Sequence, residues 1–233
     1  MNLHPIALIE TPFTQKFGIP RQGNLAADIE GIIKFEPEYC NPDYLRGIEQ
    51  FTHLWLTFGF HQHFDKSSQP LIRPPRLGGN EKIGVFASRS SFRPNPIGLS
   101  LVKNKGVAFS QGQLQLTVSD VDMLNGTPIF DIKPYIPYSD AALNPNAGYA
   151  AQAPIPNLQV SFTDESRQQA KGWENQYPDL THLLVTMLSL DPRPAYKKTS
   201  VDAKRYALQV YDLDIEWAVE NDQVLITQIR RLK

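Results

Sequence analysis

Apolar residues recur at short spacing along this chain, mostly in alternation with polar ones, which is typical of half-buried β-strands. The alternation of Leu114, Leu116 and Val118 is the clearest case. Further strands are predicted over residues 6–9, 28–35, 51–60, 107–109, 129–135, 206–219 and 224–229, and the apolar runs at 85–87 and 99–102 resemble buried strands. Asn125-Gly126 predicts a tight turn. The pattern as a whole predicts a mostly β protein.

Helical spacing is confined to a few segments. Asn41-Pro42-Asp43 predicts a helix start, with an apolar face of Tyr44, Leu45, Ile48 and Phe51.

Two more helices are predicted near the carboxyl end. One would begin at a cap on Thr163 or Asp164 and run to Gln176, and the other would begin at Asp179 or Thr181. The apolar face of the second would contain Leu183, Leu184, Met187, Leu188 and Leu190. With a hairpin formed by the last strands, these helices predict a small α+β domain.

A change of composition predicts where the chain divides. Residues 141–156 are rich in Ala, Pro and Asn and have no periodic pattern, so they are expected to form a linker. The prediction is therefore a mostly β domain over residues 1–140 and the small α+β domain over residues 157–233.

Composition limits the classes of protein to consider. With 41% hydrophobic and 20% charged residues among 233, the chain is typical of soluble globular proteins. Its single cysteine, Cys40, excludes an internal disulfide and a cysteine-based metal cluster, and favours a reducing compartment. We recognise no signal peptide, and no apolar run is long enough to cross a membrane. A cytoplasmic location is expected.

Positive charge is concentrated in two segments, although the formal net charge of the chain is −1. Residues 71–105 contain seven lysines and arginines and one acidic residue. Residues 193–205 contain five lysines and arginines and one acidic residue. Such strips suggest a polyanionic partner. In the second strip Tyr196 stands beside Lys197, and basic residues interleaved with an aromatic ring suit a single-stranded RNA loop. Internal ion pairs in the first strip, or a solvated loop in the second, remain structural alternatives.

The loop between the apolar runs at 85–87 and 99–102 has unusual chemistry. Pro94 and Pro96 remove two backbone donors and exclude a helix. Arg89 and Arg93 contribute two planar cations, and short polar side chains such as Asn95 add further hydrogen-bonding groups. A rigid, donor-rich loop of this kind predicts a platform for an anion or a nucleotide.

Two motifs carry a resemblance to a known family. GVFASRSSFRPNPIGLSLV at residues 84–102 and DPRPAYK at residues 191–197 resemble signatures of the TsaA-like family of tRNA methyltransferases. The resemblance runs nearly end to end. It implies a β-barrel domain that uses S-adenosylmethionine, the methylation of N6 of threonylcarbamoyladenosine at position 37 of tRNA, and a homodimer.

The resemblance also implies which residues contact the cofactor. These are Pro20, Arg21, Gln22, His61, Gln62, Arg89, Leu99, Asp122, Met123, Leu124 and Asn125.

The implied reaction needs a group that takes the proton of the acceptor nitrogen, and Asp131 and Asp122 are the candidates. Asp131 stands among large apolar residues, where pairing with Lys133 or an arginine is the favoured alternative. An arginine could hold the threonyl carboxylate through two parallel hydrogen bonds, and Arg93 and Arg193 are proposed because each lies beside prolines. The expected substrate-binding residues are Arg93, Asn95, Arg193, Tyr196 and Lys197.

Other functions remain open on the residues alone, because no GxGxxG motif marks a nucleotide-binding helix. The basic strips would also suit a non-catalytic RNA-binding module without a cofactor.

A metal hydrolase is the third hypothesis. His61 and His63 would share one face of an extended chain and could bind a metal with an aspartate. Hydrogen bonding at a pocket rim is the favoured interpretation of these histidines, and no metal is expected.

Overall fold

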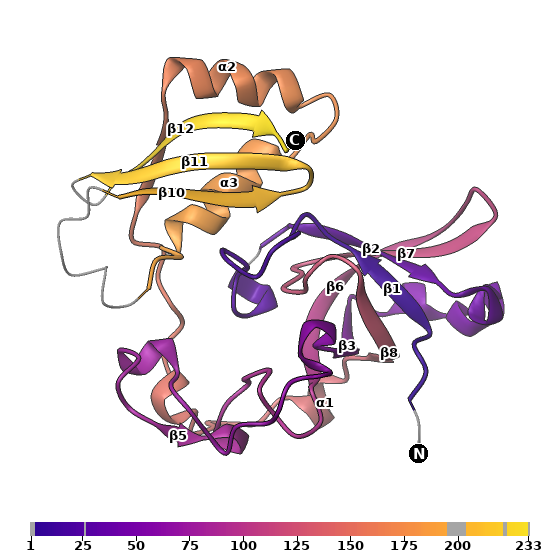
Figure 1. Cartoon of the computed structure of the whole chain (residues 1–233). Coiled ribbons are helices and arrows are strands. Elements are labelled where there is room, and N and C mark those ends of the chain that lie inside the picture. The colour runs from indigo at the N-terminus through magenta and orange to yellow at the C-terminus, as the bar shows by residue number, and fades with distance from the viewer. Residues whose placement is uncertain (1–2, 26, 195–203, 221–222, 233) are drawn as a thin grey trace.

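The computed structural model describes residues 3–25, 27–194, 204–220 and 223–232, and its main elements are labelled in Figure 1. Within these residues, six strands pair into a closed barrel in the order β1-β2-β7-β6-β3-β8. Their bounds are β1 Ala7–Glu10, β2 Glu30–Phe35, β3 His53–Gly59, β6 Ile97–Ser110, β7 Gln113–Ser119 and β8 Thr127–Pro134. All neighbours are antiparallel, and β8 returns to β1 with Ile129 opposite Ala7.

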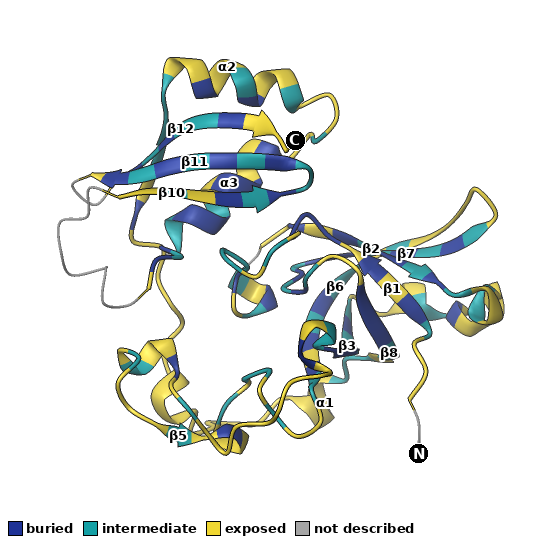
Figure 2. Cartoon of the chain, in the orientation of Figure 1, coloured by how far each residue is buried: buried dark blue, intermediate teal, exposed yellow. Residues whose placement is uncertain are grey.

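Period-two alternation places the apolar side chains inside the barrel. In β7 the buried apolar positions are Leu114, Leu116 and Val118, and the residues between them are partly exposed. Figure 2 shows the same banding along the neighbouring strands. The expectation of a mostly β chain is confirmed.

The carboxyl-terminal part forms a second sheet in the order β10-β11-β12-β9 (Figure 1). Its strands are β9 Gln159–Phe162, β10 Arg205–Val210, β11 Leu213–Glu220 and β12 Gln223–Arg231. Helix α2 (Asp164–Trp173) packs on β12, and α3 (Leu180–Ser189) packs on β9 and α2. Buried Trp217 and Leu184 belong to the core of this part.

The two parts share backbone contacts and one hydrophobic cluster. Phe13, in the loop after β1, forms an isolated bridge with Val210, and the amide of Tyr211 donates to the carbonyl of Pro12 at 2.8 Å. Buried residues of the barrel and of the second sheet belong to the same core cluster. The loop after β1 is therefore held between the barrel and the second sheet.

Residues 64–96, which we call the arm, leave the barrel after β3 and return at β6 (Figure 1). The arm contains a short hairpin of β4 (Leu71–Ile72) and β5 (Ile83–Gly84). The guanidinium of Arg76 donates to the carbonyl of Gln152, which ties the arm to the segment that follows the one-turn helix α1 (Pro137–Asp140). Phe86 is 77% exposed, and Figure 2 shows that most of the arm is solvent-exposed. The arm is thus largely exposed and is tied at Arg76 as well as at its two ends.

Several predicted elements are confirmed close to their expected bounds, including β1, β2, β3, β7, β8 and β12. The predicted cap of α2 is Thr163, whose hydroxyl accepts a hydrogen bond from the amide of Ser166 at 3.1 Å. Asp179 precedes α3, as predicted. No helix in the described part of the chain has the length and apolar character needed to cross a lipid bilayer.

The helix predicted after Asn41 is wrong. The chain forms two short 3-10 turns, Pro42–Leu45 and Ile48–Gln50, and Gly47 between them has a φ of 89°. A left-handed residue ends helical propagation, so the apolar spacing cannot continue through it. The strand predicted at 85–87 is also wrong, because Val85–Ala87 forms a 3-10 turn.

The single strand predicted over 206–219 is two strands, β10 and β11, paired as a hairpin. The turn between them contains Tyr211 at a φ of 53°, a conformation that the apolar alternation does not signal. The predicted two-stranded hairpin is accordingly a three-stranded antiparallel unit, and β9 joins it in parallel to β12.

Candidate functional site

Asp122 is the centre of a polar cluster just after the end of β7. The hydroxyl of Ser100, on β6, donates to Asp122 Oδ1 at 2.6 Å, and the nearby backbone amide of Gly23 helps to lower the pKa of this carboxyl. Burial raises the pKa of Asp122, and the hydrogen bond from Ser100 and the charge of Arg89 act in the opposite direction. The result is a desolvated carboxylate that depends on neighbouring donors.

Gly23 lies in a buried position that only a residue without a side chain can occupy. A Cβ atom there would lie 2.3 Å from the carbonyl oxygen of Asp120 and 3.1 Å from that of Leu101. Both are backbone atoms, one within β6 and the other just after β7, so they cannot move as a side chain would. The absence of a side chain thus lets the loop at residues 20–25 approach Asp122.

Arg89 connects this loop to the segment before β6. Its guanidinium donates to the side-chain oxygen of Gln22, and its charge lowers the pKa of Asp122. Burial and the positive charge of Arg76 lower the pKa of Arg21, the neighbour of Gln22. The structure therefore brings together Gln22, Arg89 and Asp122, three of the residues that are expected to contact the cofactor.

Hydrogen bonds to the loop after β1 hold residues 122–126 in place. Asn125 accepts from the amide of Thr11 at 3.1 Å, and the hydroxyl of Thr11 donates to the carbonyl of Met123 at 2.9 Å. The amide of Asn125 donates to the carbonyl of Phe13 at 2.7 Å. Gly126 has a φ of 74°, which confirms the predicted Asn-Gly turn.

His61 is joined to the same loop through Thr127. It lies in the 3-10 turn His61–His63 at the end of β3, with its Nδ1 3.5 Å from the hydroxyl of Thr127. That hydroxyl also lies 2.6 Å from the carbonyl of Leu124 and donates to it. His61 is thus connected through Thr127 to Leu124, another of the expected cofactor residues.

The second histidine of the pair has a different environment. His63 is buried at 7% exposure, its ring meets that of Phe92 edge to face, and the ammonium of Lys16 lies 3.3 Å from its Nδ1. A positively charged neighbour opposes the binding of a cation at this ring. No group of three or more His, Cys, Asp or Glu side chains with the geometry of a metal site occurs among the described residues.

The other expected residues of the central loop are placed less directly. Arg93 donates to the carbonyls of Ser88 and Ser90 at 3.2 and 3.4 Å, so it holds its own loop in shape. Asn95 is exposed, and Leu99 on β6 is 53% exposed. Pro20 is buried. None of these four residues is hydrogen-bonded to the Asp122 cluster in the described part of the chain. Their positions are compatible with ligand binding.

Asp131 lies in β8 and forms an ion pair with Lys133, as the sequence favoured. Its other hydrogen-bond partner among the described residues is the amide of Ile132, at 2.9 Å. Both partners belong to the same strand, and none of these bonds joins Asp131 to Asp122.

The expectation that Arg193 grips a substrate carboxylate does not agree with its position. Arg193 is 4% exposed, and its Nε and Nη2 donate to the two carboxylate oxygens of Asp191 at 2.8 and 3.0 Å. The guanidinium is therefore already used in a buried ion pair. Tyr196 and Lys197, predicted to bind substrate, lie outside the described residues.

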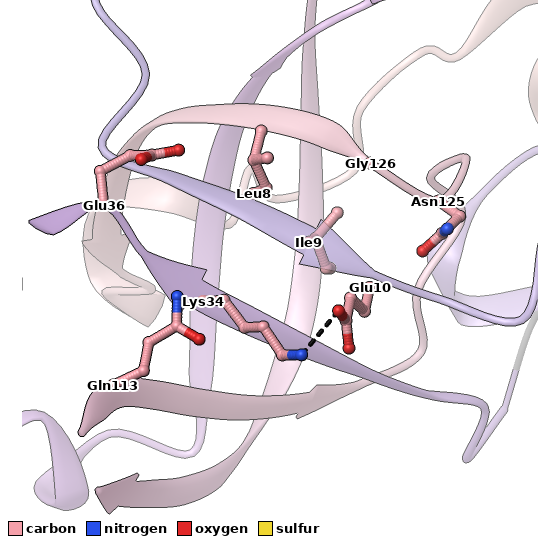
Figure 3. Close-up of a pocket in the computed structure, with 8 residues that line it drawn as sticks. All are labelled: Leu8, Ile9, Glu10, Lys34, Glu36, Gln113, Asn125 and Gly126. Atoms are coloured by element: carbon pink, nitrogen blue, oxygen red, sulfur yellow. Dashed lines mark hydrogen bonds and ion pairs between the residues drawn. The ribbon is translucent and has the colours of Figure 1, made fainter. Parts of the chain in front are cut away.

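Figure 3 shows a surface hollow of about 230 Å³ that extends from the Asn125-Gly126 turn across β1 and β2. Lys34 lies along it and donates to Glu10 at 2.6 Å. A second hollow of about 380 Å³ lies on the arm, between the hairpin and Pro94. Asp122 does not line either hollow.

The chain matches two family models in succession. Residues 8–141 match the tRNA-methyltransferase O N-terminal domain, and residues 155–232 match the TrmO C-terminal domain. The chain belongs to the TrmO family. The resemblance carried by residues 84–102 and 191–197 is thus confirmed.

Relatives in the TrmO family cover nearly the whole chain. An Escherichia coli protein named tRNA (adenine(37)-N6)-methyltransferase is 42% identical over 92% of this chain and 91% of its own length. A Pseudomonas aeruginosa protein, named as an S-adenosylmethionine-dependent methyltransferase, is also 42% identical, over 93% of this chain and 91% of its own. A crystal structure of TrmO from Pseudomonas aeruginosa matches with a TM-score of 0.81 and 33% identity, over 99% of this chain and 98% of that chain.

Sequence reasoning missed three residues that shape the site: Gly23, Ser100 and Lys16. Each acquires its importance from a contact with a segment distant in the chain. The glycine that follows Pro20-Arg21-Gln22 was the available signal, because glycine in a loop often marks a close backbone approach.

Proposed function

We propose that this chain is an S-adenosylmethionine-dependent tRNA methyltransferase that acts on N6 of threonylcarbamoyladenosine at position 37. The family and the names of its relatives support the tRNA methyltransferase class. The observation that carries the proposal for this chain is the convergence of Gln22, Arg89 and Asp122 around the close approach of Gly23.

These residues suit the cofactor chemically. When bound, S-adenosylmethionine supplies a methyl group on a positively charged sulfonium. Burial raises the pKa of the Asp122 carboxyl, and a cationic ligand would favour its ionised form. Arg89 can bind a carboxylate, and Gln22 and Asn125 offer amide groups. We therefore assign Gln22, Arg89, Asp122 and Asn125 to the cofactor.

Asp122 is also the better candidate for the proton of the acceptor nitrogen. Because its pKa is raised by burial, its carboxylate is a stronger base than an ordinary exposed one. Asp131 is instead half-exposed and paired with Lys133. Asp122 thus has the environment for proton transfer, and the loops around it position the reacting groups.

The basic strip at 71–105 supports an RNA partner. Among the described residues of the strip, Lys103 and Lys105 form ion pairs within 4.0 Å, with Asp28, Asp120 and Glu30. Arg76 is bonded to the neutral carbonyl oxygen of Gln152. Its charge is available to phosphates, which dominate the affinity of proteins for nucleic acid.

We assign residues 1–140 to the methyl-transfer domain, 141–156 to the linker and 157–233 to a small α+β domain that contributes to tRNA binding. A homodimer in the cytoplasm completes the proposal, and the exposed apolar side chains of the arm, such as Phe86, favour association. Sedimentation of the purified protein tests the dimer.

The function is tested by transfer of tritium from labelled S-adenosylmethionine to two tRNA preparations, with and without the threonylcarbamoyl group. Label should enter the first and not the second. Equal labelling of both would contradict the substrate assignment. Absence of labelling together with no calorimetric binding of S-adenosylmethionine would favour the non-catalytic RNA-binding module.

A further inference from the structure

The proposed substrate carries a carboxylate on its threonyl group, and this anion needs a partner. Arg193 is occupied by Asp191 in a buried pair, and Arg93 is bonded to its own loop. The arginines expected from the sequence are therefore poorly placed to hold it.

Polar groups from three segments form a cluster around the ring of His63. Lys16 comes from the loop after β1, His61 and His63 from the turn after β3, and Ser91 from the arm. The ammonium of Lys16 lies 3.3 Å from Nδ1 and 3.5 Å from Nε2 of His63, and the hydroxyl of Ser91 lies 3.4 Å from Nε2. Phe92 packs against the same ring with centroids 4.5 Å apart.

The cluster is positively charged and lacks a counterion. No carboxylate lies within 4.0 Å of Lys16 among the described residues, whereas Lys34 and Lys105 each have one. Burial and the charge of Lys66 lower the pKa of Lys16, and burial and the charge of Lys16 lower those of both histidines. An anion in this place would offset the repulsion.

The hydrogen bonds around the ring of His63 leave the hydroxyl of Ser91 as a donor for such an anion. An ammonium group can only donate, so the nearer ring nitrogen of His63, Nδ1, accepts from Lys16. A neutral ring then carries its proton on Nε2 and donates it to the oxygen of Ser91. The hydroxyl proton of Ser91 remains available, next to an ammonium on the exposed residue Lys16.

The cluster adjoins the proposed cofactor site. Ser91 follows Arg89 by two residues, and Lys16 precedes Pro20 by four, in the loops that carry these groups. His61 links the cluster through Thr127 to Leu124. An anion held by Ser91 would lie two residues along the chain from Arg89, which is assigned to the cofactor.

We propose that Lys16 and Ser91, oriented by His63, bind the carboxylate of the threonyl group of the acceptor nucleoside. This subsite rests on the proposed function and identifies the residues that select the modified adenosine. Lys16 forms the ion pair, Ser91 donates the second hydrogen bond, and His63 is a positioning residue.

The test compares Lys16→Met and Ser91→Ala with the wild-type protein. With threonylcarbamoylated tRNA, kcat/KM should fall about 10- to 100-fold for Lys16→Met, the usual range for loss of a charged hydrogen bond, and less for Ser91→Ala. Affinities for S-adenosylmethionine and for tRNA without the threonylcarbamoyl group should stay within about twofold. Lys16→Arg should recover part of the activity, which excludes misfolding as the cause.

Lys34→Met is the matched control, because Lys34 lies on β2, outside the basic strip, and is paired with Glu10; its kinetics should match those of the wild-type protein. A substrate in which the carboxylate is esterified supplies the second control. The wild-type protein should discriminate against the ester, and Lys16→Met should not.

Each alternative gives a different result. Equal loss of affinity for both tRNAs would make Lys16 a phosphate contact, and loss of S-adenosylmethionine affinity would assign it to the cofactor. Unchanged kinetics would also overturn the proposal. If the wild-type protein transfers no methyl group, the proposed function fails by itself. The subsite is then tested by whether Lys16→Met abolishes a binding preference for the modified tRNA.

Discussion

Gly23→Ala is the substitution that most specifically perturbs the candidate cofactor site. Gly23 is buried, and its backbone lies where the loop at residues 20–25 meets the end of β7. The added Cβ would stand 2.3 Å from the carbonyl oxygen of Asp120 and 3.1 Å from that of Leu101. The first separation is far below van der Waals contact, so either the loop or the barrel backbone has to shift.

The size of the effect follows from the atoms involved. Strands β6 and β7 are paired with each other and with β3 and β2, so the loop is the part that yields. Overpacking of this kind costs about 1–3 kcal/mol, which in a chain of this size lowers the melting temperature by about 2–12 °C. Displacement of the loop also withdraws the Gly23 amide from Asp122 and shifts Gln22, so affinity for S-adenosylmethionine should fall at least about tenfold.

The assay is calorimetric titration with S-adenosylmethionine, accompanied by thermal unfolding. Gly172→Ala is the matched control, because a Cβ at Gly172 in helix α2 meets nothing within 4 Å. It should leave cofactor affinity unchanged and stabilise the helix by about 0.5–1 kcal/mol. The reasoning would be refuted if Gly23→Ala bound S-adenosylmethionine with wild-type affinity and melted at the wild-type temperature.

The remaining predictions concern single side chains. Asp122→Asn should abolish most methyl transfer while the protein remains folded, and retained turnover would remove Asp122 from catalysis. Asp131→Asn should leave turnover within about twofold, since exposed ion pairs contribute little; a large loss in kcat would restore it as a catalytic candidate. Arg193→Met should destabilise the protein by about 3–5 kcal/mol in denaturant unfolding, because it leaves Asp191 buried without this partner; an unchanged midpoint would contradict this. Burial and the charges of Lys16 and Lys66 lower the pKa of His63, so the contribution of its neutral ring to the free energy of unfolding should be lost as pH falls below about 6.5. His63→Gln should reduce the slope of that free energy against pH, and an identical slope in the variant would exclude His63 as its source.

The sequence predicted best where the local pattern coincides with the tertiary environment. β7 combines strict alternation with an inward-facing apolar side, so its bounds and its buried residues followed from the pattern. Predictions failed where one backbone angle interrupts a good pattern. Gly47 ends helical propagation, and Tyr211 turns the chain within a continuous alternation.

The site depended on information of a different kind. The pairing of Asp131 with Lys133 was predictable because the two residues are two positions apart on one strand. The convergence of Gln22, Arg89 and Asp122 came from family resemblance, since these residues are separated by 67 and 33 positions and no local pattern joins them. Lys16 and Ser100 gain their roles only when the barrel closes, which local periodicity does not encode.

The most direct test of the proposed activity is nucleoside mass spectrometry of threonylcarbamoylated tRNA after incubation with the protein and S-adenosylmethionine. The account predicts that threonylcarbamoyladenosine is replaced by a nucleoside heavier by one methylene group, with fragmentation that places the methyl on N6. A methyl group on any other nucleoside, or an unchanged digest from folded protein that binds S-adenosylmethionine, would contradict it.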